Sequence, residues 1–310
     1  MLTKPPIPGE RMLAGTDLRL PRLAFGLWRF VGRDVSGADR LLRTALDAGL
    51  TLIDGAAVYG LDWGGASFGE SEQLLGQVLK ADPGLRARMI LATKFGITLG
   101  IPYDSSRASV IKSCEDSLRR LQTDVIDLFQ VHRPDVLTHP ADLAETLSTL
   151  RKAGKIRAAG VSNYSARQTL NLQQFLDFDL ATHQPEFSAL CLSPVHDGVL
   201  DQCLSRAMVP LAWSPLGGGR LALTLHEAHE ADPSGRLAKV ISALDHTAHE
   251  MNTTRVSVAL SFVMAHPAHP IPIIGTQNSA RIIEACRAVS IQLSRAQWYK
   301  IASAGGMDLP

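Results

Sequence analysis

Four residues that together could move a proton stand at the ends of short apolar segments or just beyond one. Asp54 closes the first segment, and Tyr59 follows it five residues later. Two later apolar runs end in Lys94 and His132. A carboxylate at the end of a buried strand is costly unless a cation pairs with it, so Asp54 requires a partner. We therefore predict that these four residues form an active site.

The chemistry that suits this set is the protonation of a substrate oxygen. Tyr59 is a neutral phenol near pH 7, with a reference pKa of about 10. A lysine ammonium beside it is expected to stabilise the phenolate and lower that pKa, while Asp54 holds the lysine. His132 could hydrogen-bond the same oxygen, and the set suits hydride delivery to an aldehyde or ketone. The alternative is a structural ion pair with Tyr59 as an aromatic residue at the rim.

An alternation of strands and helices must position these residues. Apolar strand patterns alternate along the chain with segments whose apolar residues recur at helical spacing. The predicted strands cover residues 23–26, 52–54, 89–93, 126–131, 156–161, 181–184, 209–213 and 271–274. Helices are predicted at residues 36–48, 71–79, 107–121, 141–153, 166–174, 198–207, 237–251, 255–266, 280–289 and 295–303.

Eight strand–helix units predict one closed (β/α)8 barrel, or TIM barrel, forming a single domain over residues 1–310. An N-terminal β-hairpin is expected within residues 11–22, and extra helical segments at the C-terminus. The rival fold, a doubly wound open sheet, requires a glycine fingerprint after the first strand, and residues 23–28 lack one. Segments 61–70 and 216–235 follow strands on the side where a barrel carries its chemistry, so we expect them to shape a substrate pocket.

The composition bounds the class of protein. The chain has 310 residues, 45% of them hydrophobic, and a net charge of +1, which gives no indication of nucleic-acid or anionic-membrane binding. No apolar stretch approaches about 20 residues, and the N-terminus lacks a signal-peptide core. The four cysteines contain no CxxC pair and are expected to be reduced thiols of a cytoplasmic protein. Histidine pairs three residues apart lack the HExxH pattern, so no metal is expected.

Seven motifs, in order along nearly the whole chain, resemble those of the aldo-keto reductases. They are DGAAVYG (54–60), ATK (92–94), QVHRP (130–134), GKIRAAGVSNY (154–164), HQPEF (183–187), AWSPLGGG (212–219) and IIGTQNSAR (273–281). The resemblance implies a barrel that reduces carbonyls with NAD(P)H, without metal or flavin, most commonly as a monomer. It also implies that Tyr59 is the proton donor, that Lys94 and Asp54 tune it, and that His132 orients the carbonyl.

The expected cofactor residues rest on their chemistry and on the family motifs together. Amide and hydroxyl side chains at the ends of the fifth and sixth strands suit the nicotinamide carboxamide. Trp213 offers a flat face for the nicotinamide ring, where the family more often has Tyr, and the glycine-rich loop beyond it suits the pyrophosphate. The predicted cofactor-binding residues are Ser162, Asn163, Gln184, Trp213, Ser214, Leu216, Gly218, Gly275, Thr276, Arg281 and Glu284.

The last regular helix indicates which cofactor is preferred. Gly275 and Thr276 leave the eighth strand and Arg281 follows, so a 2′-phosphate would meet helix N–H groups, a hydroxyl and a guanidinium. This arrangement favours NADPH over NADH. Glu284 matches the family position that contacts the adenine amine. Two departures, Gly275 where many relatives have Lys and Ala285 where many have Asn, predict poorer adenine contacts.

The substrate pocket is predicted to be lined by Trp28, Trp63 and Arg133. Arg133 stands where many relatives carry Trp; it could face a polar group of the substrate, such as a carboxylate, or instead pair with Asp135. The HRPD, LGGGR and MDLP motifs are similar to those of a bacterial subgroup of predicted oxidoreductases. The sequence therefore predicts an NADPH-dependent carbonyl reductase. The alternatives are an NADPH-binding redox sensor or regulatory subunit with little turnover, and an isomerase-type barrel that binds a sugar phosphate.

Overall fold

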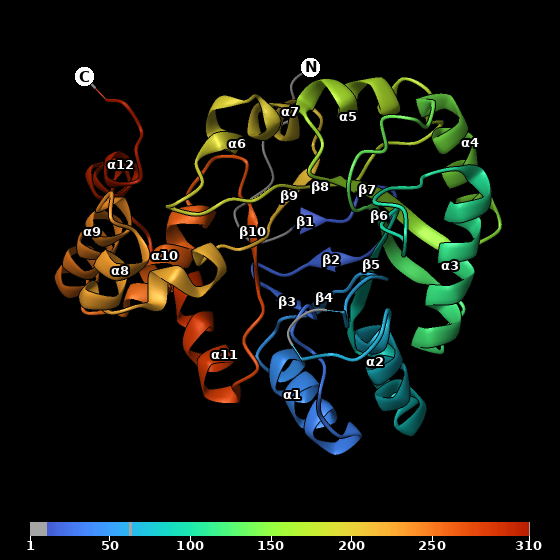
Figure 1. Ribbon diagram of the computed structural model, residues 1–310, viewed down its shortest axis with the longest axis horizontal. Coiled ribbons are helices and arrows are strands. Elements are labelled where there is room, and N and C mark those ends of the chain that lie inside the picture. Colours follow the sequence, from blue (N-terminus) through green and yellow to red (C-terminus); the bar gives the residue numbers. More distant parts are fainter. Residues whose placement is uncertain (1–10, 62–63, 310) are drawn as a thin grey trace.

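Eight parallel strands close into a barrel in the computed structural model, which describes residues 11–61 and 64–309. The order around the ring follows the sequence from β3 to β10, and β10 pairs with β3. The predicted TIM barrel is confirmed (Figure 1). The strands are β3 (Ala24–Gly26), β4 (Leu52–Asp54), β5 (Ile90–Phe95), β6 (Ile126–Val131), β7 (Ile156–Ser162), β8 (Thr182–Gln184), β9 (Val209–Ala212) and β10 (Ile271–Ile274).

Helices cover the outside of this barrel (Figure 1). Among the described residues, no helix is long and apolar enough to cross a membrane. The helices are α1 (Val35–Asp47), α2 (Glu70–Ala81), α3 (Arg107–Leu121), α4 (Pro140–Lys152), α5 (Ala166–Gln173), α6 (Ser193–His196), α7 (Val199–Ser205), α8 (Leu225–Ala231), α9 (Arg236–Glu250), α10 (Arg255–Met264), α11 (Ser279–Cys286) and α12 (Arg295–Ala304), with the 3-10 segments η1 (Pro83–Arg88), η2 (Gly217–Ala222) and η3 (Arg287–Ser290).

Both faces of the barrel strands are buried, which explains their nearly continuous apolar sequences. In β5, Ile90 and Ala92 belong to a cluster inside the barrel, whereas Leu91 and Phe95 belong to the cluster between barrel and helices. Side chains alternate along a strand, so Lys94 continues the inward series. The strand extends through Phe95, and Lys94 therefore lies within it rather than just after it, as the sequence had suggested.

A short hairpin closes one end of the barrel, as predicted. Strand β1 (Arg11–Met12) pairs with β2 (Arg19–Leu20) in antiparallel fashion, and the two lie across the ring of strands (Figure 1). Leu13 and Leu20 are buried in the same cluster as the inward side chains of the barrel strands. The loop of the hairpin faces the amino ends of β6 and β7. The hairpin is thus the apolar floor, and the carboxyl ends of the strands form the opposite, open end.

Some short helical elements were not expected from the sequence. Residues 216–235 are not a plain loop: they contain η2 and helix α8, whose first turn is held by a capping box between Thr224 and Glu227. The helix α6 and the segment η1 were not predicted. In the other expected pocket segment, 61–70, residues 62 and 63 are outside the described part of the chain, and so Trp63 has no described position.

Candidate active site

The predicted catalytic residues meet at the carboxyl end of the barrel. Asp54 is the last residue of β4, Lys94 lies one residue before the end of β5, and His132 directly follows β6. Tyr59 lies in the loop between β4 and α2. Because the carboxyl ends of parallel strands share one rim, residues that are far apart in sequence come together there.

Lys94 is the centre of this group. Its Nζ lies 2.6 Å from Oδ2 of Asp54, 2.8 Å from the carbonyl oxygen of Gly55 and 3.3 Å from the hydroxyl of Tyr59. The Lys94 and Asp54 side chains are both buried. A buried ion pair is tolerated where its geometry is good and further hydrogen bonds satisfy the remaining groups, and these contacts give each ammonium proton an acceptor.

Lys94 lowers the pKa of Tyr59, as predicted, but the net shift of this pKa is upward. Burial raises the pKa of this phenol above its ordinary value of 10.0, and this effect exceeds the lowering caused by Lys94. Burial by itself would lower the pKa of Lys94, but Asp54 and then Tyr59 raise it, and the net shift is upward. Tyr59 is therefore a neutral phenol beside a charged ammonium, which is the form that can donate a proton.

His132 lies edge-on to Tyr59, with the ring centroids 5.9 Å apart. Burial lowers the pKa of the imidazole well below its ordinary value of 6.5, and the positive charges of Lys94 and Arg133 lower it further. The ring is therefore neutral at pH 7. A neutral imidazole can donate one N–H to a substrate oxygen without bringing a second charge into the site.

The predicted nicotinamide residues form a hydrogen-bond network with one another. Asn163, in the left-handed region with a φ of 58°, donates through Nδ2 to the carbonyl of His132 at 3.0 Å and to Oγ of Ser162 at 2.9 Å. Its Oδ1 accepts the indole N–H of Trp213 at 3.0 Å. Ser162 in turn donates to the carbonyl of Gln184. The network ties the ends of β6 to β9 together and holds the Trp213 ring in one orientation.

The Asp54 carboxylate receives two amide donors besides Lys94. The Nε2 of Gln184, a predicted cofactor-binding residue, donates to Oδ1 of Asp54 at 3.0 Å. The Nε2 of Gln130 donates to the same oxygen at 3.3 Å. Sequence reasoning missed Gln130. The signal was present, since Gln130 is a buried polar residue in an apolar strand and lies in register with Lys94.

The glycine-rich turn after β9 contains three consecutive glycines in the left-handed region. Gly217, Gly218 and Gly219 all have positive φ angles, which favour glycine. The N–H groups of Gly217 and Gly219 donate to the carbonyls of Ser214 and Leu216. Leu216 and Gly218, two of the predicted cofactor-binding residues, both lie in this turn.

The predicted 2′-phosphate residues lie around the start of α11. Asn278 caps this helix: its Oδ1 accepts the N–H groups of Ala280 and Arg281. Thr276 precedes the cap, and Gln277 between them has a buried Oε1 without a hydrogen-bond partner in the described part of the chain. The Arg281 side chain is exposed, and Glu284 lies one turn further along the same helix, half-buried.

The residues predicted to line the substrate pocket include a charged one. The guanidinium of Arg133 lies 5.9 Å from the ring centroid of Trp213. Glu186, which the sequence reading missed, bridges backbone to backbone with Trp213. Asp135 instead accepts the N–H groups of Ser105 and Leu137 and the Thr138 hydroxyl, and no Arg133–Asp135 ion pair is described. Trp28 is exposed at the end of β3, on the same rim.

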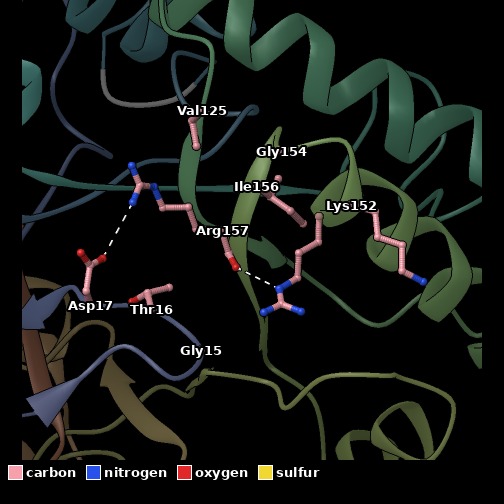
Figure 2. Close-up of a pocket in the computed structure, with 9 residues that line it drawn as sticks. Gly15, Thr16, Asp17, Val125, Lys152, Gly154, Ile156 and Arg157 are labelled. Atoms are coloured by element: carbon pink, nitrogen blue, oxygen red, sulfur yellow. Dashed lines mark hydrogen bonds and ion pairs between the residues drawn. The ribbon is translucent and has the colours of Figure 1, made fainter.

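A pocket lined by several basic residues lies at the amino end of the barrel. It has a volume of about 890 Å³ and lies between the hairpin loop and the amino ends of β6 and β7. Figure 2 shows Arg157 reaching toward Asp17 there. Arg151 donates to the carbonyl of Arg157. Lys152 pairs with Asp177. Because its cations already have partners, this pocket is a stabilised surface rather than a second candidate for the chemistry.

Comparison with known proteins identifies one family over nearly the whole chain. The aldo/keto reductase family model matches residues 22–305. A 6-dehydroglucose reductase from Novosphingobium aromaticivorans is 44% identical over 306 residues, covering 98% of each chain. The oxidoreductase YdhF from Escherichia coli is 35% identical, covering 93% of this chain and 95% of YdhF.

The fold likewise has a solved relative. The crystal structure of the thermostable aldo-keto reductase Tm1743, in complex with the inhibitor epalrestat, superposes with a TM-score of 0.78. The two sequences are 24% identical, and the match covers 95% of this chain and 99% of the other. Barrel, motifs and relatives agree: this chain belongs to the aldo/keto reductase family and is an oxidoreductase.

Proposed function

We propose that the chain reduces an aldehyde or ketone to an alcohol with NADPH, and that Tyr59 is the general acid. The observation that carries this proposal is the contact between the Tyr59 hydroxyl and Lys94, whose ammonium is held by the buried Asp54. A neutral phenol with a cation 3.3 Å away can give up a proton to a developing alkoxide, because the resulting phenolate is paired at once.

Each of the four residues has a distinct part in this reaction. The Tyr59 O–H bond breaks as its proton passes to the carbonyl oxygen of the substrate, and Lys94 stabilises the phenolate that remains. Neutral His132 donates a hydrogen bond to the same oxygen and so polarises the carbonyl. Asp54 keeps Lys94 charged and in place. Solvent then returns a proton to Tyr59.

The residues at the rim fit a nicotinamide dinucleotide. When bound, the cofactor supplies the hydride. The flat face of Trp213, fixed by its bond to Asn163, suits a nicotinamide ring, and the turn at Gly218 suits a pyrophosphate, since a Cβ there would meet no atom within 4 Å. At the α11 end, the Thr276 hydroxyl and the exposed Arg281 suit a 2′-phosphate, and Glu284 suits an adenine amine. These groups support NADPH over NADH.

The relatives suggest the first substrate to test. The relative that is 44% identical over nearly its full length is named a 6-dehydroglucose reductase, which points to a sugar bearing a terminal aldehyde. Charged groups near Trp213 support a polyhydroxylated substrate: Arg133, beside the Trp213 ring, offers hydrogen-bond donors, and Glu186, close enough to feel the charge of Arg133, offers acceptors. We further propose that the chain is a cytoplasmic protein of one domain. We also propose that it is a monomer, and size-exclusion chromatography tests this oligomeric state.

The decisive experiment is a titration followed by turnover. NADPH and NADH are titrated by fluorescence against the wild type and Tyr59→Phe, and NADPH oxidation is then followed with 6-dehydroglucose and a panel of simpler aldehydes. We expect tight NADPH binding by both proteins and turnover by the wild type alone. Tight binding with no turnover on any substrate would support the redox-sensor alternative, and absence of binding would overturn the proposal.

A further inference from the structure

A row of buried polar side chains runs inside the barrel beyond the four catalytic residues. Gln130 in β6 and Thr182 in β8 are both completely buried. Gln130 lies one residue before the end of β6 and Thr182 is the first residue of β8. Each would be costly to bury without a partner. The interior below them is apolar, with Leu52, Leu128 and Val209 among its members. Their presence therefore calls for a reason.

The two side chains meet across an intervening strand. The register pairs Gln130 with Gly160 of β7 and Gly160 with Thr182, so the three residues form one row. Oγ1 of Thr182 donates to Oε1 of Gln130 at 3.0 Å. A Cβ at position 160 would lie 2.0 Å from Oγ1 of Thr182 and 3.3 Å from Cγ of Gln130. The glycine therefore leaves the space in which this hydrogen bond forms.

The row ends on the catalytic carboxylate. Because Oε1 of Gln130 accepts from Thr182, its Nε2 is the group that faces Oδ1 of Asp54, at 3.3 Å. Gln184 gives the same oxygen a second donor, and Lys94 binds the other oxygen. Donors thus run in one direction from Thr182 through Gln130 to Asp54. Such a chain orients the carboxylate and spreads its charge over dipoles in a buried site.

We propose that Thr182 and Gln130 are positioning residues, which act through two linked hydrogen bonds across Gly160 to hold the Asp54 carboxylate toward Lys94. This inference rests on the function proposed above, because it names what sets the proton affinity of Tyr59. The charged groups that face Tyr59 are Lys94 from β5, Asp54 from β4 and Arg133 from the loop after β6.

The physical effect is electrostatic and has a definite sign. The amide N–H of Gln130 presents a positive dipole end to Asp54, which partly offsets the negative potential of the carboxylate at Tyr59. Without the Thr182 hydroxyl, the Gln130 amide loses the bond that fixes its orientation. The potential at Tyr59 then becomes more negative, and the phenolate is less stable. The pKa of Tyr59 must rise.

The test compares Thr182→Val, which removes only the hydroxyl at constant shape, with Thr182→Ser, which keeps the hydroxyl. Proteins labelled with ¹³C at the tyrosine Cζ are titrated with NADP⁺ bound, and the Tyr59 signal among the four tyrosines is assigned with Tyr59→Phe. We expect the onset of ionisation to move up by about half a unit in Thr182→Val and to stay unchanged in Thr182→Ser. The same shift should appear in the pH profile of alcohol oxidation, which needs the Tyr59 phenolate.

Gln130→Met is the second variant, since it keeps the length of the side chain and removes both hydrogen bonds. We expect it to raise the onset by about one unit. Thermal melting shows whether Thr182→Val folds. If it does not, the titration of Gln130→Met tests the inference instead. If Tyr59 ionises at the same pH in Thr182→Val and Thr182→Ser, or if Gln130→Met does not move its ionisation, the inference is overturned. The proposed reductase function is not affected by that result. Failure of wild-type turnover would instead contradict the proposed function, and the NMR titration, repeated without NADP⁺, would still decide the role of the row.

Discussion

The two ends of the barrel carry the same kinds of charged residue and use them differently. At the carboxyl end, the Lys94 and Asp54 side chains are 0% and 3% exposed. At the amino end, the side chains of the Lys152–Asp177 pair are 73% and 51% exposed. Water can replace a lost partner at the amino end but not inside the barrel. Burial, more than residue type, thus decides which charges can tune chemistry.

The largest expected effect concerns the acid itself. Tyr59→Phe removes one hydroxyl and should lower kcat for carbonyl reduction by about 10³-fold. The reason is that, in the described part of the chain, Tyr59 is the proposed proton donor that contacts Lys94. The dissociation constant of NADPH, measured by fluorescence, should change little. A loss below about tenfold would mean that water supplies the proton and that the carboxyl end is not organised around Tyr59.

Removing a cation from each end tests the comparison directly. Lys94→Met leaves Asp54 buried without its cation and should lower the free energy of unfolding by about 3–5 kcal/mol. Lys152→Met at the amino end should cost less than about 1 kcal/mol, since its pair is exposed. Urea denaturation of both variants measures the difference. Equal losses at the two ends would refute the contrast between them.

The rim of the carboxyl end should show an intermediate effect. Arg281→Ala removes the guanidinium proposed to meet the 2′-phosphate, and the dissociation constant of NADPH should rise by about tenfold, as expected for one charge-assisted contact. NADH lacks that phosphate, so its dissociation constant should not change. Calorimetric titration with both cofactors gives the answer, and a parallel loss for both would place Arg281 elsewhere in the binding site.

The smallest expected effect is that of pH on reduction. The raised pKa of Tyr59 keeps the acid protonated at and above its ordinary value of 10.0, and the lowered pKa of His132 keeps the imidazole neutral down past 6.5. Both reactive forms therefore persist across the neutral range. Between about pH 6.5 and 9, kcat/KM for reduction should vary less than about twofold. Alcohol oxidation, which needs the phenolate, should rise with pH over the same range.

Much of the fold and the meeting of the four proposed catalytic residues could be predicted because they depend on local patterns. Apolar strands alternating with amphipathic helices predicted the barrel, and Asp54, Lys94 and His132 stand at the ends of such strands. Helix α8 was missed although its capping box, Thr224 with Glu227, is readable in the sequence. Its short length and the glycines before it obscured the helical pattern.

Other features depend on register, burial and the direction of side chains, which local patterns do not contain. The Tyr59 pKa rises because desolvation outweighs the nearby ammonium, and only the packed site sets that balance. Likewise, the direction of Gln184 toward Asp54 follows from how β8 faces β4 across the barrel interior.

The sequence by itself determined the barrel and the order in which its reactive residues arrive at one rim, because strand and helix periodicity and parallel connections are encoded locally. The groups that hold the Asp54 carboxylate are set by the packing of the closed barrel. The hydrogen bond between Thr182 and Gln130 exists because the closed ring sets their strands in register on either side of Gly160. The role of Gly160, which is to leave space for this hydrogen bond, can be recognised only when the residues on the neighbouring strands are known.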